Sequence, residues 1–330
     1  MYPKPKTKFI TLLSCLALAV ALGLPFIGTQ AVSWHDLIGN SRSTSYFIFW
    51  NLRFPRVMLA MTTGGILAAA GVAFQALFRN PLATPYTLGV SSGAAFGAAL
   101  TIKLGITMSL MGISGVSLGA FSGALLVVLI IYSFTQIRND FSTSTMLLAG
   151  VAMSIFFSSL ILLLQFLADF TQTVQIVRWL MGSLAVIGYQ PLVSILPLGL
   201  IGLITLFWLR MDMNMMLMGE ELAASRGVHV NRTKLLIFLS VSLMTSAVVS
   251  VCGPIGFIGL IIPHAVRRFV GIDHFILLPS SILVGAIFLA LSDTLARMMI
   301  APTEIPVGVI TALVGGPFFL WILLRKDLEM

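Results

Sequence analysis

The sequence predicts an all-α, polytopic membrane protein with about ten transmembrane helices. Its 330 residues are 58% hydrophobic and only 9% charged, with a mean hydropathy of +1.05. In a soluble domain, charged residues make up roughly a quarter of the chain. The apolar residues also come in runs of about 18 to 25, long enough to cross about 30 Å of hydrocarbon. Nearly the whole chain is therefore expected to lie in a bilayer.

Ten apolar runs predict the spans, and the prolines, glycines and charges that interrupt them set their limits. In chain order they cover residues 9–28, 56–78, 88–106, 112–134, 142–166, 190–209, 233–252, 256–270, 275–298 and 305–324. The first run follows three lysines and is longer than the apolar part of a signal peptide, so we expect an uncleaved helix. The longest polar stretches are under thirty residues, and residues 1–330 are therefore expected to form one domain.

The charges between the spans predict their orientation. With the amino terminus inside, thirteen of the nineteen basic residues fall on the inner side: Lys4, Lys6, Lys8, Arg79, Arg138, Arg210, Arg226, Arg232, Lys234, Arg267, Arg268, Arg325 and Lys326. The other six fall outside or near the outer face: Arg42, Arg53, Arg56, Lys103, Arg178 and Arg297. Cytoplasmic loops carry an excess of lysine and arginine, so both termini are expected to be cytoplasmic. The net charge of +8 thus reports topology, and no basic stripe predicts a nucleic-acid partner.

The second and third spans are joined by a proline-rich segment. Pro81 and Pro85 end the helix before them. Gly89, Gly93 and Gly97 then recur every four residues, a spacing that lets another helix backbone approach closely. These glycines either pack helices together or line a path through the membrane.

The loop at residues 210–232 predicts a short helix outside the membrane. Glu220 and Glu221 would lie at its positive amino end, Arg226 in its last turn, and Gly227 where helices end in the left-handed conformation. Five methionines precede it within residues 211–218. Flexible thioethers suit a surface that packs into a partner's groove, while plain loop packing and soft-metal binding are the alternatives.

Two further features lie in the last third of the chain. Residues 252–264 hold two prolines and three glycines, which predicts either a broken transporter helix or a tight re-entry between two short helices. Asp293 and Arg297 are four residues apart near the outer face and close enough to pair. With Arg53 and Arg56 at the start of the second span, Arg297 would form an outward-facing cluster suited to an acidic partner.

Five segments match, in order, the pattern of one transporter family: residues 79–93, 219–228, 253–264, 278–297 and 306–317. The chain resembles the permeases of the iron-siderophore, haem and vitamin B12 family of binding-protein-dependent ABC importers. The resemblance implies the type II ABC importer permease fold and a homodimer or a pair with a homologous permease. It also implies two cytoplasmic ATP-binding subunits, an extracytoplasmic substrate-binding protein and a bacterial cytoplasmic (inner) membrane as the location.

The resemblance also implies roles for individual residues. Coupling to the ATPase falls to Gly219, Glu220, Glu221, Ala224, Arg226 and Gly227, docking of the binding protein to Arg53, Arg56 and Arg297, and the inner gate to Asn80, Leu88, Ser142 and Thr143. The chain itself is expected to bind no cofactor or metal and to catalyse no reaction, because ATP and Mg²⁺ belong to the partner ATPase. Ferric siderophore is the first choice of substrate, with haem, vitamin B12 or an oxyanion as alternatives.

Two other functions fit parts of the sequence. An ion-coupled secondary transporter would use Asp293 or Asp169 to carry protons or sodium. An intramembrane protease would use Ser91 or Ser92 in the Gly-Val-Ser-Ser-Gly turn, but a nucleophile also needs a base and an oxyanion site. The sequence has no phosphate-binding loop of the G-x-x-x-x-G-K-[ST] type. Any ATP that drives this protein is therefore expected to bind another chain.

Overall fold

A computed structural model describes residues 4–30, 32, 43–110, 112–137 and 143–326. These residues form helices and one small antiparallel hairpin, β1 (Ser109–Leu110) with β2 (Ile113–Ser114). The helices that correspond to the ten predicted spans are α1 (Lys4–Gly23), α4 (Phe54–Phe78), α5 (Val90–Lys103), α6 (Gly115–Ile137), α7 (Thr143–Leu167), α9 (Gln190–Trp208), α12 (Val230–Cys252), α13 (Ile258–Val270), α14 (His274–Met298) and α15 (Val307–Lys326). The predicted all-α, multi-span fold is confirmed.

The remaining helices are short and lie between the spans. They are η1 (Leu24–Phe26), α3 (Thr44–Phe47), η2 (Ile48–Arg53), η3 (Pro85–Leu88), α8 (Phe170–Leu180), α10 (Arg210–Met216) and α11 (Glu220–Ser225). In the part of the chain that the structure describes, seven helices are long and apolar enough to cross a membrane. The other three are shorter: α5 and α13 have 14 and 13 residues and extend only about 20 Å, and the apolar part of α15 is Val307–Trp321.

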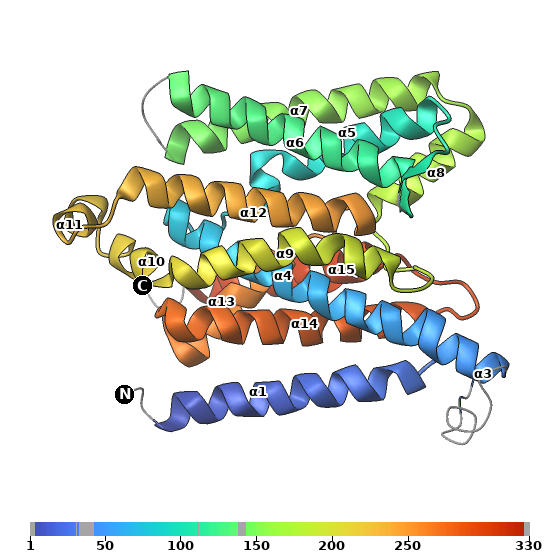
Figure 1. Cartoon of the computed structure of the whole chain (residues 1–330), viewed down its shortest axis with the longest axis horizontal. Coiled ribbons are helices and arrows are strands. Elements are labelled where there is room, and N and C mark those ends of the chain that lie inside the picture. Colours follow the sequence, from blue (N-terminus) through green and yellow to red (C-terminus); the bar gives the residue numbers. More distant parts are fainter. Residues whose placement is uncertain (1–3, 31, 33–42, 111, 138–142, 327–330) are drawn as a thin grey trace.

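The spans run side by side in one bundle (Figure 1). α1 lies along α14 at one edge, α4, α9, α12 and α13 fill the middle, and α5, α6 and α7 form the other edge. The start of α1 and the short helices α10 and α11 lie at one end of the bundle, while α3, α8 and the hairpin lie at the opposite end. We call these the α11 end and the α3 end.

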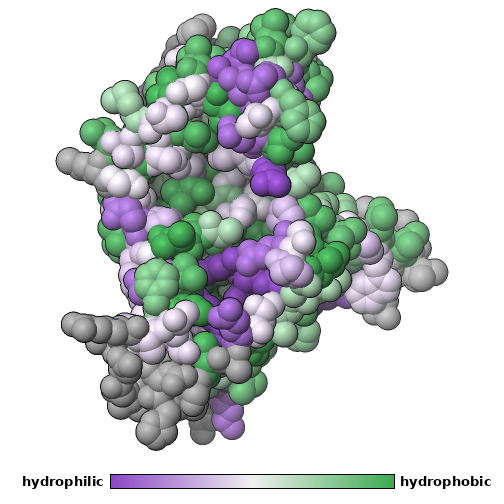
Figure 2. Space-filling model, turned by 90° about the vertical axis from the view of Figure 1, so that its right-hand side faces the viewer, coloured by the Kyte–Doolittle hydropathy of each residue, from purple (hydrophilic) through white to green (hydrophobic). Residues whose placement is uncertain are grey.

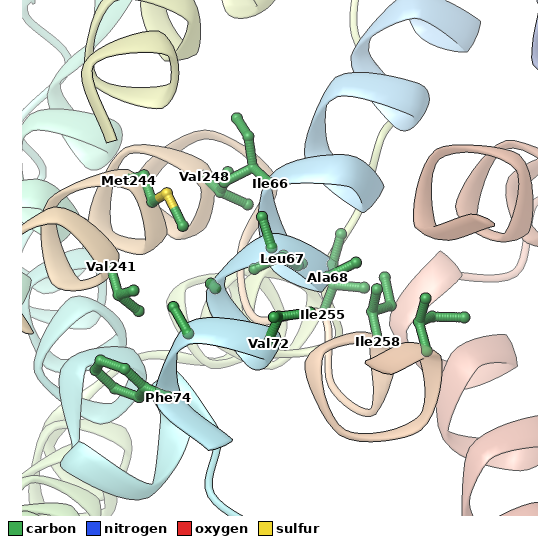
Figure 3. Close-up of a cluster of buried hydrophobic side chains, with 14 of the residues drawn as sticks. Ile66, Leu67, Ala68, Val72, Phe74, Val241, Met244, Val248, Ile255 and Ile258 are labelled. Atoms are coloured by element: carbon green, nitrogen blue, oxygen red, sulfur yellow. The ribbon is translucent and has the colours of Figure 1, made fainter. Parts of the chain in front are cut away.

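α4 is the central helix, and nearly all of its side chains are buried. It can approach its neighbours closely because glycines face each other: a Cβ on Gly64 would collide with the backbone of Gly285 in α14, and one on Gly71 with that of Gly259 in α13. Around this contact lie the apolar side chains drawn in Figure 3, including Ile66, Leu67, Ala68, Val72 and Phe74 of α4 and Val241, Met244 and Val248 of α12. The core is therefore built outward from α4.

The glycine repeat of the third span packs helices. A Cβ on Gly93 or Gly97 would overlap the backbone of Gly123 or Gly119 in α6. Gly89 has a φ of 75° and caps the amino end of α5, a conformation that glycine adopts without steric cost. Of the two alternatives for these glycines, the structure supports helix packing for Gly93 and Gly97.

The chain reverses direction at the break between α12 and α13. Gly253 and Phe257 both have φ near 68° there, and for Phe257 this left-handed backbone is sterically unfavourable. The peptide groups of Ile255 are satisfied by one side chain from η3: the Tyr86 hydroxyl donates to the Ile255 carbonyl oxygen at 2.8 Å and accepts from its N–H at 3.2 Å. The break is thus a re-entry between one long helix and one short helix. The backbone groups that the break leaves without helical partners are covered by protein.

The longest of the helices that the sequence did not predict is α8. The stretch 167–189 has the composition of a loop, yet residues 170–180 form α8. Asp169 caps it by accepting from the Gln172 N–H at 2.8 Å, and the Gln172 side chain accepts from the Asp169 N–H in return. This reciprocal capping box is readable in a sequence as D-x-x-Q, and it was the signal that could have revealed the helix.

Substituting Gly71 tests the close contact between α4 and α13. We expect Gly71→Ala to lower the free energy of unfolding by about 1–3 kcal/mol, because the added methyl group must push two backbones apart. Gly23→Ala is the matched control, since a Cβ there meets nothing within 4 Å. Thermal unfolding of the purified protein in detergent would measure both. Equal melting temperatures for the two variants would contradict the proposed contact.

Candidate functional site

α10 and α11 form a compact platform at the α11 end. It is tied to the spans by polar contacts from both short helices. The Thr233 hydroxyl of α12 donates to Asp212 at 2.9 Å, and the Lys234 ammonium pairs with Glu220 at 2.6 Å. The Asn214 amide donates to Asp273, just before α14, at 2.8 Å. The platform is therefore held to α12 and to the start of α14.

The six residues predicted to couple to an ATPase lie together on and beside α11. Gly219 and Gly227 flank it with φ of 125° and 88°, conformations that glycine adopts without strain. Ala223 packs inward, while Glu221, Ala224 and Arg226 are exposed. Glu220 is partly exposed and turns toward α12, where it pairs with Lys234 and lies 3.9 Å from Arg79. The free face of α11 thus carries one acid, one base and the exposed Leu222.

The methionines before α11 divide between core and surface. Met213 and Met216 are fully buried, and Met211 and Met218 are exposed. The sulfur of Met215 lies 3.9 Å from the Arg226 guanidinium. No group of three metal-ligating His, Cys, Asp or Glu residues occurs among the described residues. Loop packing explains the inner pair, and the outer pair extends the apolar part of the platform.

The predicted gate residues that the structure describes lie in three different segments. Leu88 is buried at the end of η3, where its backbone packs against Gly150 of α7, and Thr143 is the first residue of that helix. Asn80 lies apart, in the turn after α4, where its side chain accepts from the Leu82 N–H at 2.9 Å. Ser142 lies outside the described residues.

The three arginines predicted to dock a partner gather at the α3 end. Figure 2 views this end and shows hydrophilic residues collected near its middle. Arg53 ends η2, Arg56 lies in the first turn of α4, and Arg297 lies in the last turn of α14. The aromatic rings of Phe26, Phe49, Trp50 and Phe54 pack against one another in the segments around Arg53, as in the aromatic belts of membrane interfaces.

The expectation that these arginines face outward needs correction, because all three are largely buried. Arg53 donates to the backbone carbonyl oxygen of Gln30 at 2.6 Å. Arg56 makes a two-pronged contact with Asp293, at 2.9 Å for both Nε and Nη2, and Arg297 lies 3.3 Å from the same carboxylate. The i,i+4 pairing of Asp293 with Arg297 is confirmed. The sequence showed no sign of the stronger partner, Arg56, which is 237 residues away.

Asp293 is unsuited to carrying an ion. Its side chain is only 1% exposed, and two guanidinium groups already surround it. A proton or sodium ion would have to displace these permanent positive charges. The ion-coupled transporter therefore gains no support from this site.

Comparison with known proteins decides the family. The FecCD transport family matches residues 11–325. The chain belongs to this family. Among its relatives, the hemin transport system permease HmuU of Yersinia pestis is 38% identical over 94% of this chain and 93% of that protein. The cobalamin import system permease BtuC of Halobacterium salinarum is 41% identical over 94% of this chain and 82% of that protein.

Solved structures agree with the family. A metal-chelate type ABC transporter in an inward-facing conformation matches with a TM-score of 0.86 and 33% identity, over 97% of this FecCD chain and 99% of that chain. PsaBC from Streptococcus pneumoniae, at 20% identity and a TM-score of 0.53, shares the fold over 81% of this chain and 89% of that one. The protein is thus a multi-pass permease of the ABC importer type.

In this FecCD permease, a cleft of about 560 Å³ opens beside the arginines. Its lining comes from four segments: residues 28–30, residues 48–56, residues 185–187 and the end of α14 with the loop after it. At the α11 end, a second cleft of about 510 Å³ is lined by Arg79, Arg267 and Arg268 with His264 and His274. Each end of the permease therefore has a basic hollow next to a surface that a partner can reach.

Removing the Asp293 carboxylate tests its structural role. We expect Asp293→Ala to lower the free energy of unfolding by about 3–5 kcal/mol, because two buried guanidinium groups lose their shared anion. Glu304→Gln, at a side chain that is 45% exposed, is expected to cost less than about 1 kcal/mol. Denaturant unfolding in detergent micelles would compare the two. A cost below about 1 kcal/mol for Asp293→Ala would refute the structural role.

Proposed function

We propose that the chain is the permease subunit of an ABC importer that carries a ferric siderophore across the bacterial cytoplasmic membrane. Two copies, or one copy and a homologous permease, would enclose the path between them. Two ATP-binding subunits would dock at the α11 end, and a substrate-binding protein would deliver the chelate at the α3 end. ATP and Mg²⁺ would bind only the ATPase subunits, and the permease itself would make and break no covalent bond.

The observation that carries this proposal is the construction of the α10–α11 platform. Its outer face is free, while its inner face is fixed to α12 and α14 by ion pairs and hydrogen bonds. A helix of six residues has little stability of its own, so these contacts hold it in shape. Such an element can receive a displacement from a partner and pass it to the spans.

Alternating access would use both ends of the bundle. Closure of the ATPase pair on ATP would move the platform, and the movement would reach α12 and α14. At the inner side, α7 and η3 meet at Gly150 and Leu88, and their separation would open the path. Bringing the substrate in a separate binding protein fits a permease with few charges at membrane depth, because specificity then lies largely in that protein.

The choice of substrate rests on the relatives. Beside the hemin and cobalamin permeases, a probable iron chelatin permease of Helicobacter pylori is 36% identical over 95% of this chain and 96% of that protein. Metal chelates are thus a common cargo among these names, and ferric siderophore is our choice, with haem, vitamin B12 or an oxyanion as alternatives.

Reconstituted uptake tests the proposed function. The permease would be placed in vesicles with its ATPase and binding protein, and uptake of radiolabelled ferric siderophore, hemin and cobalamin would be compared. We expect ATP-dependent uptake of the siderophore alone. Uptake driven by an ion gradient without the ATPase would overturn the importer, and ATP-driven uptake of hemin or cobalamin would overturn only the choice of substrate.

The free face of α11 can be tested separately. We expect Glu221→Ala combined with Arg226→Ala to weaken ATPase binding about tenfold, or roughly 1.4 kcal/mol, because both charged groups of that face are lost. Arg178→Ala, an exposed arginine at the α3 end, is the control. Pull-down of ATPase by the detergent-solubilised permease would measure the change. Unchanged binding in the double variant would show that this face is not the ATPase contact.

A further inference from the structure

We propose that Glu304 holds, in the unliganded permease, the position that a carboxylate of the binding protein takes when it docks. The inference rests on the proposed function, in which an acidic partner meets the arginines of the α3 end. The new element is that Glu304, a residue of the permease itself, competes with the binding protein for Arg56. Docking then becomes an exchange of one carboxylate for another on Arg56.

The first step is the number of donors on Arg56. Its Nε and Nη2 groups donate to Asp293, and its Nη1 group donates to Glu304 at 2.8 Å. Each of the three guanidinium nitrogens thus contacts a carboxylate of the same chain, and Glu304 takes the contact that Asp293 leaves open on Nη1. An external carboxylate can take this Nη1 contact only if Glu304 leaves it.

The second step is which partner can leave. Asp293 is 1% exposed and is held by both Arg56 and Arg297, so its removal would leave two buried cations without an anion. The Glu304 side chain is 45% exposed and has one arginine partner among the described residues. An ion pair at such an exposed position contributes about 1 kcal/mol or less. Glu304 is therefore the partner that can be replaced.

The third step is the charge. Arg56 and Arg297 carry two positive charges against the single negative charge of Asp293. Glu304 supplies the second negative charge and balances these two arginines, while Arg53 in the same cleft keeps one further positive charge. When Glu304 turns away, one more uncompensated positive charge faces the cleft, and an anion from outside can balance it.

The fourth step is the position of Glu304. It lies in the exposed connection between α14 and α15, at the α3 end. The connection folds back on α14, because the Ile305 N–H donates to the Ala296 carbonyl oxygen at 3.1 Å. The neighbouring cleft of about 560 Å³ is lined by Arg56, Arg297 and Glu304 together. There is room beside the arginines for an incoming side chain.

In the described part of the chain, Arg53 binds backbone groups and not a carboxylate. Its guanidinium group donates to the backbone carbonyl oxygens of Phe26 and Gln30. These contacts fasten the segment after α1 to the start of α4. Of the three arginines, Arg56 and Arg297 are thus the pair that a docking carboxylate would contact.

The test is the affinity of the binding protein for the intact permease–ATPase complex in nanodiscs. The probe is the purified substrate-binding protein of the same import system, and the complexes carry wild-type permease, Glu304→Gln or Glu304→Asp. Asp169→Asn is the matched control: it removes the same charge from an exposed site at the α3 end and keeps a side chain that can cap α8. Biolayer interferometry at low and high salt gives each dissociation constant.

We expect Glu304→Gln to tighten binding about tenfold at low salt, since the amide no longer competes for Arg56. The gain should shrink at about 0.5 M salt, where exposed charges are screened. Glu304→Asp and Asp169→Asn should bind as the wild type does. Equal or weaker binding by Glu304→Gln, or equal tightening by Asp169→Asn, overturns the exchange while leaving the importer intact. Absence of binding by the wild type and by both Glu304 variants overturns the docking step of the proposed function itself.

Discussion

Direct contact between helix backbones along α4 is the interaction on which the rest of this structure depends. A bundle in hydrocarbon gains little from burying more apolar surface, because lipid tails are as apolar as leucine side chains. Close packing must supply the attraction instead. The glycine pairs Gly64 with Gly285 and Gly71 with Gly259 bring α4 against α14 and α13. The other helices then pack around this centre.

The few charged residues of the bundle lie at its two ends. At the α3 end, one buried aspartate holds the start of α4 to the end of α14 through Arg56 and Arg297. At the α11 end, Glu220 and Lys234 join the platform to α12. Between them the core is apolar apart from hydroxyls and the Gln75 amide. This distribution keeps costly groups near water while marking both ends for contact with other proteins.

The spans, their order and the short α11 helix could be predicted from the sequence, because apolar length and capping residues are local signals. The break at residues 253–257 was also visible, since prolines and glycines mark it directly. What the sequence could not show was pairing between distant residues. Arg56 and Asp293 are 237 positions apart, and no periodicity connects them. The arginines therefore seemed free when they are in fact occupied.

The hydrogen bonds between Tyr86 and Ile255 restrict how two segments of the bundle can move. One phenol hydroxyl serves both the donor and the acceptor of a single residue, 169 positions further along the chain. The loop that follows α4 and the reversal that precedes α13 are thereby pinned at one point. As long as both bonds persist, these two segments move as one piece, and any rocking of the bundle must find its pivot elsewhere. Tyr86 thus makes the junction of η3 with the break before α13 stiff, so that bending must occur in other parts of the bundle.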